Sequence, residues 1–321
     1  EYTEMFEAMF ARAKPDIVTL ELLGWFDFED LPKLIDRELL DPQAYAAAEA
    51  AAERGGEPPE ILFLRKSADL DELDPKPPPV FLISAMSTQH EEVAGAVEAL
   101  KKRFPGAYVA AGGPHAAALP ETMLEVGADA VCLGEGEEQT FAFLQALGRG
   151  ASPAQAATLA GFRTTDTEGE RPAPTTLEAW PAVSVRFSAF GPIEITRGCP
   201  NRCLFCQTPR LFGPVRHRPL ESVLAAADEM LSRGMRDVRC LAPNALAYGS
   251  RDAREPNTNA LETLLSSLRR LVERRNGRLF FGTFPSEVRP EFVRADTLRI
   301  LARHVHNRRL VIGVQSGSDE T

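Results

Sequence analysis

Three of the chain's five cysteines lie within eight positions, in the stretch RGCPNRCLFCQTP. The spacing is Cys199-x3-Cys203-x2-Cys206, and an aromatic residue, Phe205, precedes the last cysteine. Thiolates are soft ligands that suit zinc or an iron–sulfur cluster. A structural zinc site needs a fourth ligand, and His217 lies eleven residues beyond Cys206 in a proline-flanked segment. Three sulfurs with one open position suit a 4Fe-4S cluster whose fourth iron binds a substrate or cofactor. A zinc site or a simple electron-transfer cluster is the alternative.

The cysteine loop directly follows a predicted strand that opens a block of alternating strands and helices. Such alternation predicts a parallel sheet whose strands end at one shared edge. Four strand–helix units fit before Thr321, so we expect a barrel that is incomplete at this point. The predicted strands are 192–198, 237–242, 278–283 and 309–314, and the predicted helices are 220–233, 261–272 and 294–303.

In cysteine spacing, in the aromatic residue before the last cysteine and in the order of elements, this block resembles the radical S-adenosylmethionine (SAM) enzymes. Their signature is C-x3-C-x-aromatic-C after the first strand of a partial (β/α)6 barrel. The resemblance implies that Cys199, Cys203 and Cys206 bind three irons of a 4Fe-4S cluster and that SAM chelates the fourth. Reductive cleavage of SAM would then give methionine and a 5′-deoxyadenosyl radical, which abstracts hydrogen from a substrate. Phe205 would pack beside the cluster, or simply in the core.

The same resemblance implies partners and further ligands. The electron donor would be a reductase with flavodoxin or a ferredoxin, and the substrate a small molecule or a peptide. Polar residues after the second, third and fourth strands are candidates for binding the methionyl and ribose groups of SAM: Asn244, Ser286, Glu287, Arg289, Gln315 and Ser316. The family's GGE segment after the second strand is replaced here by PN, which leaves the contact to the SAM amine unassigned. For Glu287 and Arg289, a mutual or helix-capping ion pair is an equal alternative.

An earlier block also alternates strands and helices. Its continuous apolar runs are typical of strands buried on both faces, so we predict a doubly wound α/β domain. The predicted strands are 80–86, 107–113 and 128–134, with further candidates at 16–24 and 60–65; helices are predicted over 93–104 and 120–126, around Phe141 and Leu144, and over 45–52. Residues 69–79 are acidic and proline-rich, which predicts a loop.

Glycine motifs in this block, GGPH and GEGE, resemble those of the cobalamin-binding domain that precedes the barrel in one radical SAM subgroup. The resemblance implies that a serine contacts the cobalamin nucleotide tail and that glycines let backbone approach the cofactor. The residues concerned are Ser84, Gly112, Gly113, Gly134 and Glu135. Ordinary strand-to-helix turns are the alternative. The D-x-H-x-x-G segment that supplies a cobalt ligand in other cobalamin proteins is missing, and His115 follows the wrong strand to replace it.

The expected architecture is therefore α/β throughout. A Rossmann-like domain of the cobalamin-binding type spans 1–150, a linker with a hairpin turn at 166–169 spans 151–190, and a partial (β/α)6 radical SAM barrel spans 191–321.

Composition limits the expected partners and the expected cell compartment of the protein. The net charge of −10, from 46 acidic and 36 basic residues, disfavours a broad nucleic-acid surface. No apolar run approaches the ~20 residues of a membrane span. A few clustered cysteines argue against a disulfide scaffold and for the reducing cytoplasm.

Three functions follow from these features. The first is a cobalamin-dependent radical SAM methyltransferase that acts on an unactivated carbon. The second is a radical SAM enzyme for rearrangement, cyclisation or sulfur insertion, with a scaffold as first domain; the tRNA methylthiotransferases are such enzymes, but their extra cluster cysteines find no match here. The third is a non-catalytic iron–sulfur electron carrier or sensor, which the open coordination position disfavours.

Overall fold

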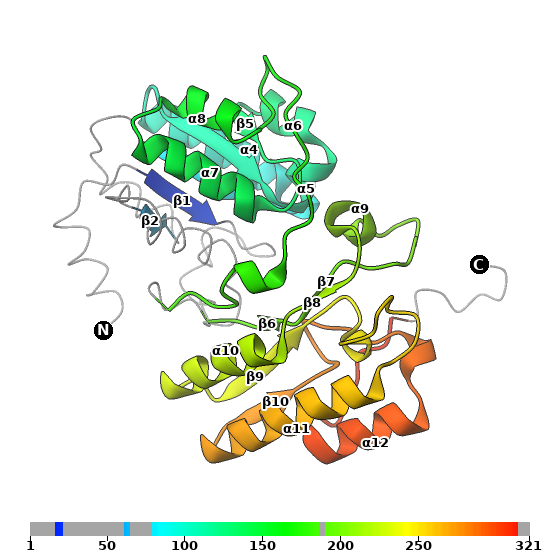
Figure 1. The fold of residues 1–321 in the computed structure, drawn as a ribbon. Helices are drawn as coiled ribbons and strands as arrows, with labels where there is room; N and C mark the ends of the chain where they lie inside the picture. Colours follow the sequence, from blue (N-terminus) through cyan, green and yellow to red (C-terminus); the bar gives the residue numbers. More distant parts are fainter. Residues whose placement is uncertain (1–16, 22–60, 65–78, 186–189, 314–321) are drawn as a thin grey trace. The chain divides into compact units, whose positions relative to one another are not determined.

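The computed structural model describes residues 17–21, 61–64, 79–185 and 190–313. Within them the chain divides between Ala173 and Pro174 into two compact units, which we describe separately (Figure 1). The helix expected at 45–52 and, except for Pro79, the loop expected at 69–79 lie outside the described residues.

The first unit is built on one parallel sheet with the strand order β2-β1-β3-β4-β5. Both candidate strands before residue 79 are confirmed, and they form β1 and β2. In this doubly wound order the direction of winding reverses between β1 and β3, and ligands bind beside the carboxyl ends of the strands at such a point. The strands are β1 (Ile17–Glu21), β2 (Ile61–Leu64), β3 (Val80–Ser84), β4 (Tyr108–Gly112) and β5 (Ala130–Val131).

Helices cover both faces of this sheet, because alternate residues of a strand point to opposite sides. Phe81 and Ile83 belong to a core with α4, α5 and α6, whereas Val80 belongs to a second core with α7 and α8. Burial on both sides explains why the strands read as continuous apolar runs. The helices are α4 (His90–Arg103), α5 (Gly113–Ala118), α6 (Pro120–Glu125), α7 (Gly136–Gly148) and α8 (Pro153–Leu159).

One glutamine of α7 holds the segment after this helix in the first unit. The buried Gln139 side chain donates hydrogen bonds to the carbonyls of Ala160, Gly161 and Glu170 at 3.1, 2.9 and 3.0 Å. An antiparallel bridge also joins Val131 to Arg163. The sequence predicted an irregular connection here. The helix α8 was not predicted, because the only residues that it buries are alanines.

The second unit contains a parallel sheet of order β10-β9-β6 and a separate antiparallel pair, β7–β8. Its strands are β6 (Ile193–Glu194), β7 (Thr196–Arg197), β8 (Arg216–His217), β9 (Asp237–Leu241) and β10 (Arg278–Phe280). Its helices are α9 (Thr208–Phe212), α10 (Leu220–Ser232), α11 (Thr258–Arg274) and α12 (Ala295–His304), and short 3-10 turns span Leu177–Ala179 (η3), Ala245–Ala247 (η4) and Pro290–Phe292 (η5).

The core of this unit lies between the sheet and α10, α11 and α12, as in the wall of a barrel. Val238 and Cys240 of β9 face that core, and α11 contributes leucines at helical spacing, including Leu261 and Leu268. Up to Gly313, the predicted strand 309–314 forms only a parallel bridge between Val288 and Ile312.

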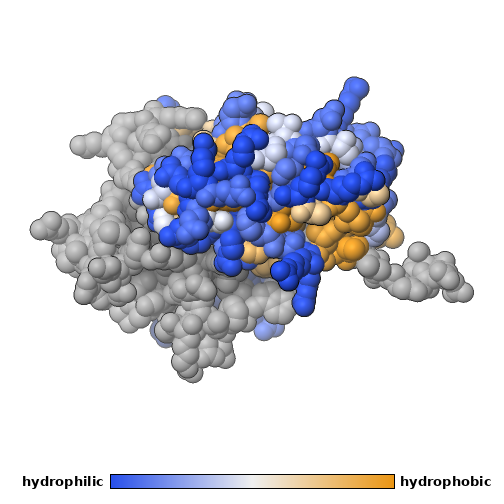
Figure 2. All heavy atoms as spheres, turned by 90° about the horizontal axis from the view of Figure 1, so that it is seen from below, coloured by the Kyte–Doolittle hydropathy of each residue, from blue (hydrophilic) through white to orange (hydrophobic). Residues whose placement is uncertain are grey.

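The described surface is mostly hydrophilic when viewed from below Figure 1, with one apolar area at its side (Figure 2). No helix among the described residues combines the length and the apolar character that a membrane crossing requires.

Candidate cluster and cofactor sites

The cysteine loop is closed at its base by the β7–β8 pair. Thr196 pairs with His217 and Arg197 with Arg216, so all three cysteines lie on the intervening segment 198–215. The Cys199 N–H donates to the Gly213 carbonyl at 3.3 Å. Gly198 has φ of 82°, and a Cβ atom there would collide with the Pro214 carbonyl. Only glycine fits at this position, immediately before the first cysteine.

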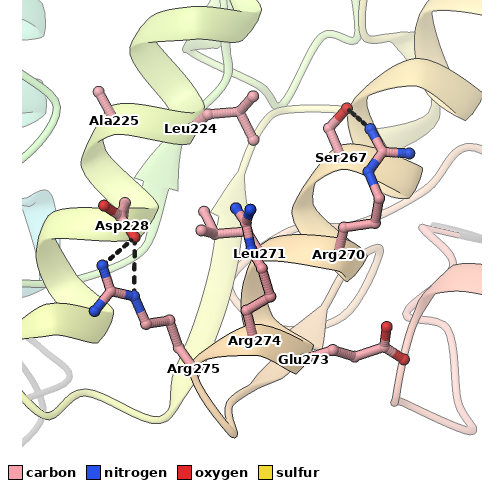
Figure 3. A pocket seen from close by; sticks show the side chains of 9 residues that line it. All are labelled: Leu224, Ala225, Asp228, Ser267, Arg270, Leu271, Glu273, Arg274 and Arg275. Atoms are coloured by element: carbon pink, nitrogen blue, oxygen red, sulfur yellow. Dashed lines mark hydrogen bonds and ion pairs between the residues drawn. The ribbon is translucent and has the colours of Figure 1, made fainter.

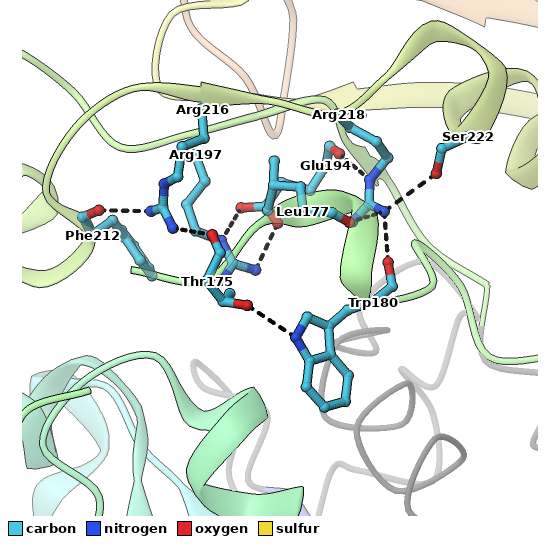
Figure 4. A network of polar contacts seen from close by, with 9 residues as sticks. All are labelled: Thr175, Leu177, Trp180, Glu194, Arg197, Phe212, Arg216, Arg218 and Ser222. Carbon is cyan, nitrogen blue, oxygen red and sulfur yellow. Dashed lines mark hydrogen bonds and ion pairs between the residues drawn. The ribbon is translucent and has the colours of Figure 1, made fainter. Parts of the chain in front are cut away.

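Arginines anchor both ends of this loop (Figure 4). On the entering strand, Arg197 forms a two-point ion pair with Glu194, at 2.9 Å from Nε and 2.8 Å from the second nitrogen, and its guanidinium lies 5.5 Å from the Phe212 ring centroid. On the returning strand, Arg216 donates to the carbonyls of Phe212 and Thr175. The loop is therefore held to both β6 and the segment before η3.

A third arginine is buried below the loop. Arg218 is 1% exposed and donates to the carbonyls of Glu194, Leu177 and Trp180 at 2.9, 2.6 and 2.7 Å. A buried guanidinium needs such partners, because an unpaired charge away from water is costly. This network was not predicted from the sequence; the available signal was the pair of arginines at 216 and 218, just before the helix predicted at 220–233.

The loop thiols have the donor chemistry of an iron–sulfur site. Cys199, Cys203 and Cys206 are free and half-buried. Asn201 donates to the Cys199 sulfur at 3.4 Å. Within the described part of the chain, no three His, Cys, Asp or Glu side chains are arranged to hold a metal ion. The loop thus supplies three soft donors on one short segment without a preformed coordination geometry.

Phe205 is 71% exposed and the adjacent Leu204 is 95% exposed. The structure therefore excludes simple core packing for Phe205, whereas its packing beside a cluster stays a prediction.

One arginine from the end of the parallel sheet reaches the cysteine loop. The guanidinium of Arg289 interacts with Cys203. It also pairs with Glu291, at 2.5 Å from Nε to the carboxylate, rather than with Glu287, the partner considered from sequence. The pKa of Arg289 is raised above its ordinary value, chiefly by the hydrogen bond to Glu291 and further by Cys203. This places a fixed positive charge beside the middle cysteine.

The other predicted SAM residues differ in how much hydrogen-bonding capacity they retain. Ser286 is fully buried; its hydroxyl donates to the Cys240 carbonyl at 2.6 Å and accepts from the Ala242 N–H at 2.9 Å. It therefore joins the segment after β10 to the end of β9. Glu287 is exposed, Asn244 is buried, and Gln315 and Ser316 lie outside the described residues.

The predicted cobalamin residues lie at the carboxyl edge of the first sheet. Ser84 and Gly112 are partners in the β3–β4 register. Gly113 has φ of 88°, and a Cβ atom there would lie 2.8 Å from the backbone of Ala85 and from the Ser84 hydroxyl. The two strand ends therefore approach so closely that only glycine fits. At Gly134 a Cβ atom would meet Pro172 at 2.8 Å. Glu135 is buried at the start of α7.

Histidines near both sites are already hydrogen-bonded. His115 lies 3.0 Å from the hydroxyls of Ser87 and Thr122, and burial, followed by the nearby His90, lowers its pKa. His217 donates from Nε2 to the Ser250 carbonyl at 2.7 Å, so its Nδ1 accepts from the Thr196 hydroxyl at 2.9 Å. Burial also lowers the pKa of His217. Because both ring nitrogens of His217 have partners, the structure disfavours it as a fourth zinc ligand.

A groove on the outside of the second unit contains none of the predicted site residues (Figure 3). It lies between α10 and α11, and four of its polar side chains form two pairs: Arg275 donates to Asp228 at 2.8 Å and Arg270 to Ser267 at 3.0 Å. The groove therefore offers no support for a second site.

A doubly wound domain followed by a barrel unit with a C-x3-C-x2-C loop is the arrangement expected of a radical SAM protein with a cobalamin-type domain. Comparison with protein families agrees: residues 68–144 match the B12 binding domain and residues 193–321 match the Radical SAM superfamily. The chain therefore carries a B12 binding domain followed by a radical SAM domain. The cofactors of these two domains are a 4Fe-4S cluster, SAM and cobalamin.

Relatives cover parts of the chain. The ribosomal protein uS12 methylthiotransferase RimO of Pelobacter propionicus is 40% identical over 96 residues, which are 30% of this chain and 20% of that protein. An uncharacterized Methanopyrus kandleri protein, MK0932, is 27% identical over 252 residues, 64% of this chain and 46% of that protein. The chain thus spans less than half the length of either relative.

A solved structure supports the fold. The radical SAM methyltransferase TsrM from Kitasatospora setae, determined with a tryptophan substrate and a SAM analogue, superposes with a TM-score of 0.61 at 17% identity. The similarity covers 90% of this chain and 57% of that chain.

Proposed function

We propose that this chain forms the cofactor-binding part of a cobalamin-dependent radical SAM methyltransferase that methylates an unactivated carbon. One observation carries the proposal: a closed three-cysteine loop and a cobalamin-type sheet edge, with no room for a side chain at Gly113, occur in the same chain. Both the fold of TsrM and the B12 domain favour methyl transfer over chemistry that needs only the cluster.

Different residues of the chain would have different roles. Cys199, Cys203 and Cys206 would hold the cluster, and Arg216, with the Arg197–Glu194 pair, would hold the loop that presents them. When bound, the cluster and SAM supply one-electron cleavage of a carbon–sulfur bond, and cobalamin supplies a carrier for the methyl group. The protein's own contribution is to orient these groups and to exclude water from them.

The predicted cobalamin residues have a consistent place in this proposal. Ser84 and Gly112 end adjacent strands, and the strand order puts their edge beside the point where the winding reverses. A cofactor lying across that edge would meet backbone rather than side chain at Gly113, and would meet the N-terminus of α7 near Glu135. We therefore assign the nucleotide tail to Ser84 and the close backbone approach to the glycines.

Methylthio transfer is the second candidate. It is favoured by the 40% identity to the RimO protein of Pelobacter propionicus, whose name describes methylthio transfer to ribosomal protein uS12. That identity covers 96 residues. Analysis of a modified substrate by mass spectrometry separates the two, since one adds a methyl group and the other a methyl group with sulfur.

Cofactor loading tests the proposal. Anaerobically reconstituted protein should contain about four irons per chain, retain added hydroxocobalamin through gel filtration, and release 5′-deoxyadenosine when SAM and a reductant are added. Cys203→Ala should abolish iron binding and cleavage. Cys240→Ala, which removes a buried thiol outside the loop, is the matched control and should retain both. Failure of wild-type protein to release 5′-deoxyadenosine would contradict the proposal, and failure to retain cobalamin would leave only the non-methylating radical SAM alternative.

The proposal also concerns the cell compartment, the electron donor and the class of substrate. An open cluster that must be reduced fits a cytoplasmic protein supplied by flavodoxin, its reductase or a ferredoxin. The substrate would be a small molecule or a peptide. The outer helices carry paired charges, such as Arg275 with Asp228, rather than a basic stripe, which favours these substrates over nucleic acid.

A further inference from the structure

Asn244 combines deep burial with an unused hydrogen-bond donor. It follows β9 and is 5% exposed. Its side-chain nitrogen Nδ2 is buried and has no hydrogen-bond partner among the described residues. Of the four buried polar atoms in that condition, it is the one that belongs to a fully buried residue; the others are on His90, Arg163 and Arg239.

The orientation of this amide is fixed from its other side. The Arg289 N–H donates to Asn244 Oδ1 at 3.3 Å. Next to it, the Ala245 N–H donates to the Glu287 carbonyl at 2.9 Å, which locks the segment after β9 against the segment after β10. Turning the amide over would set its NH2 group against the Arg289 N–H, donor against donor. The unused group is therefore the donor.

A buried amide left without a partner is unusual and costly. Ser286, at the same junction, shows the ordinary situation, because its hydroxyl both donates and accepts within the fold. Asn244 stabilises its surroundings with one half of the amide only. A ligand with an acceptor oxygen would satisfy the other half.

The position of Asn244 restricts which ligand that is. The backbone N–H of Arg289 fixes the amide, and the guanidinium of the same residue interacts with Cys203, so Arg289 links Asn244 to the cysteine loop. An amide N–H needs an acceptor oxygen, and a carboxylate oxygen is a strong acceptor. The methionyl carboxylate of SAM is such a group, whereas the SAM amine offers hydrogens and would need an acceptor.

We propose that the Asn244 side-chain amide donates a hydrogen bond to the carboxylate of SAM, with Arg289 as the residue that positions it. The inference rests on the proposed SAM site and adds a specific contact: a donor to the carboxylate, at the place where the PN sequence stands after the second barrel strand.

Two substitutions separate this contact from a structural role. Asn244→Asp keeps an oxygen for the Arg289 N–H and removes only the donor, whereas Asn244→Ala removes both. We expect each to weaken SAM binding to the reconstituted holoprotein, measured by equilibrium dialysis, by roughly ten- to a hundredfold, the range for a hydrogen bond to a charged group. Asn259→Asp, the same change at an exposed position on α11, should leave the affinity unchanged. Weakening by Asn244→Ala alone would show a structural role and overturn the proposal.

Decarboxylated SAM tests the partner atom directly. If the amide contacts the carboxylate, removing the carboxylate and truncating Asn244 to alanine should be non-additive, because either change already destroys the bond. Additive losses would overturn the assignment. The electron paramagnetic resonance spectrum of the reduced cluster should shift less on SAM addition in Asn244→Asp than in wild type. These outcomes are distinct from failure of the proposed function, in which wild-type protein itself would neither bind nor cleave SAM.

Discussion

Replacing Arg218 by methionine should strongly destabilise the second unit. Methionine has a similar length and helix or strand tolerance but no donor, so the carbonyls of Glu194, Leu177 and Trp180 lose their shared partner. Three buried acceptors at about 1–2 kcal/mol each amount to about 3–6 kcal/mol, a large part of a domain's stability. The matched control is Arg274→Met on the exposed face of α11, which should change stability by less than ~0.5 kcal/mol.

Urea unfolding followed by tryptophan fluorescence measures this effect. The chain has two tryptophans, so a Trp25→Phe background leaves Trp180 as the reporter. Trp180 is well placed because it is 4% exposed, its carbonyl accepts from Arg218 and its indole donates to the Thr175 hydroxyl at 3.0 Å. A loss below ~1 kcal/mol in Arg218→Met would refute the view that these carbonyls depend on the guanidinium.

Three further predictions concern single residues near the two sites. Gly113→Ala should lower the thermal stability of the first unit and the retention of cobalamin, because the new Cβ meets Ala85 at 2.8 Å in a left-handed backbone, whereas Gly95→Ala, with nothing within 4 Å, should be neutral or stabilising by roughly 0.5–1 kcal/mol. Equal effects at the two glycines would contradict this. Gly198→Ala should reduce iron per chain after reconstitution, since the loop base cannot accept a side chain; full iron loading would show that the loop tolerates one. The free energy of unfolding should fall as the pH drops below about 6.5, because burial lowers the pKa of His217 in the folded protein and the unfolded chain is protonated first. His217→Gln should flatten this dependence, by at most about 1.4 kcal/mol per pH unit, and an unchanged slope would rule out His217 as a contributor.

The fold could be predicted to the extent that burial leaves a pattern in the sequence. Strands such as β3 are apolar on both faces, and α11 repeats leucines at helical spacing, so both were evident. The β7–β8 pair could not be predicted, because two residues on each strand carry no periodicity. The burial of Arg218 could not be predicted either, because it depends on carbonyls about forty residues earlier along the chain.

The candidate sites were predicted unevenly for a related reason. The cysteine spacing is local chemistry, and it identified the loop from sequence. Positions after parallel strands identified Ser286 and Asn244 as a group, but sequence cannot show which has hydrogen-bonding capacity to spare. That depends on the neighbouring chain segment, which satisfies Ser286 completely and Asn244 only in part.

The three carbonyls that accept hydrogen bonds from Gln139 determine where the chain can be divided into fragments. A fragment ended at the close of α7 would keep the glutamine, 4% exposed, and discard every one of those acceptors, together with the strand-like partner of Val131. Dissection of the two halves for separate expression should therefore leave residues through Ala173 with the first.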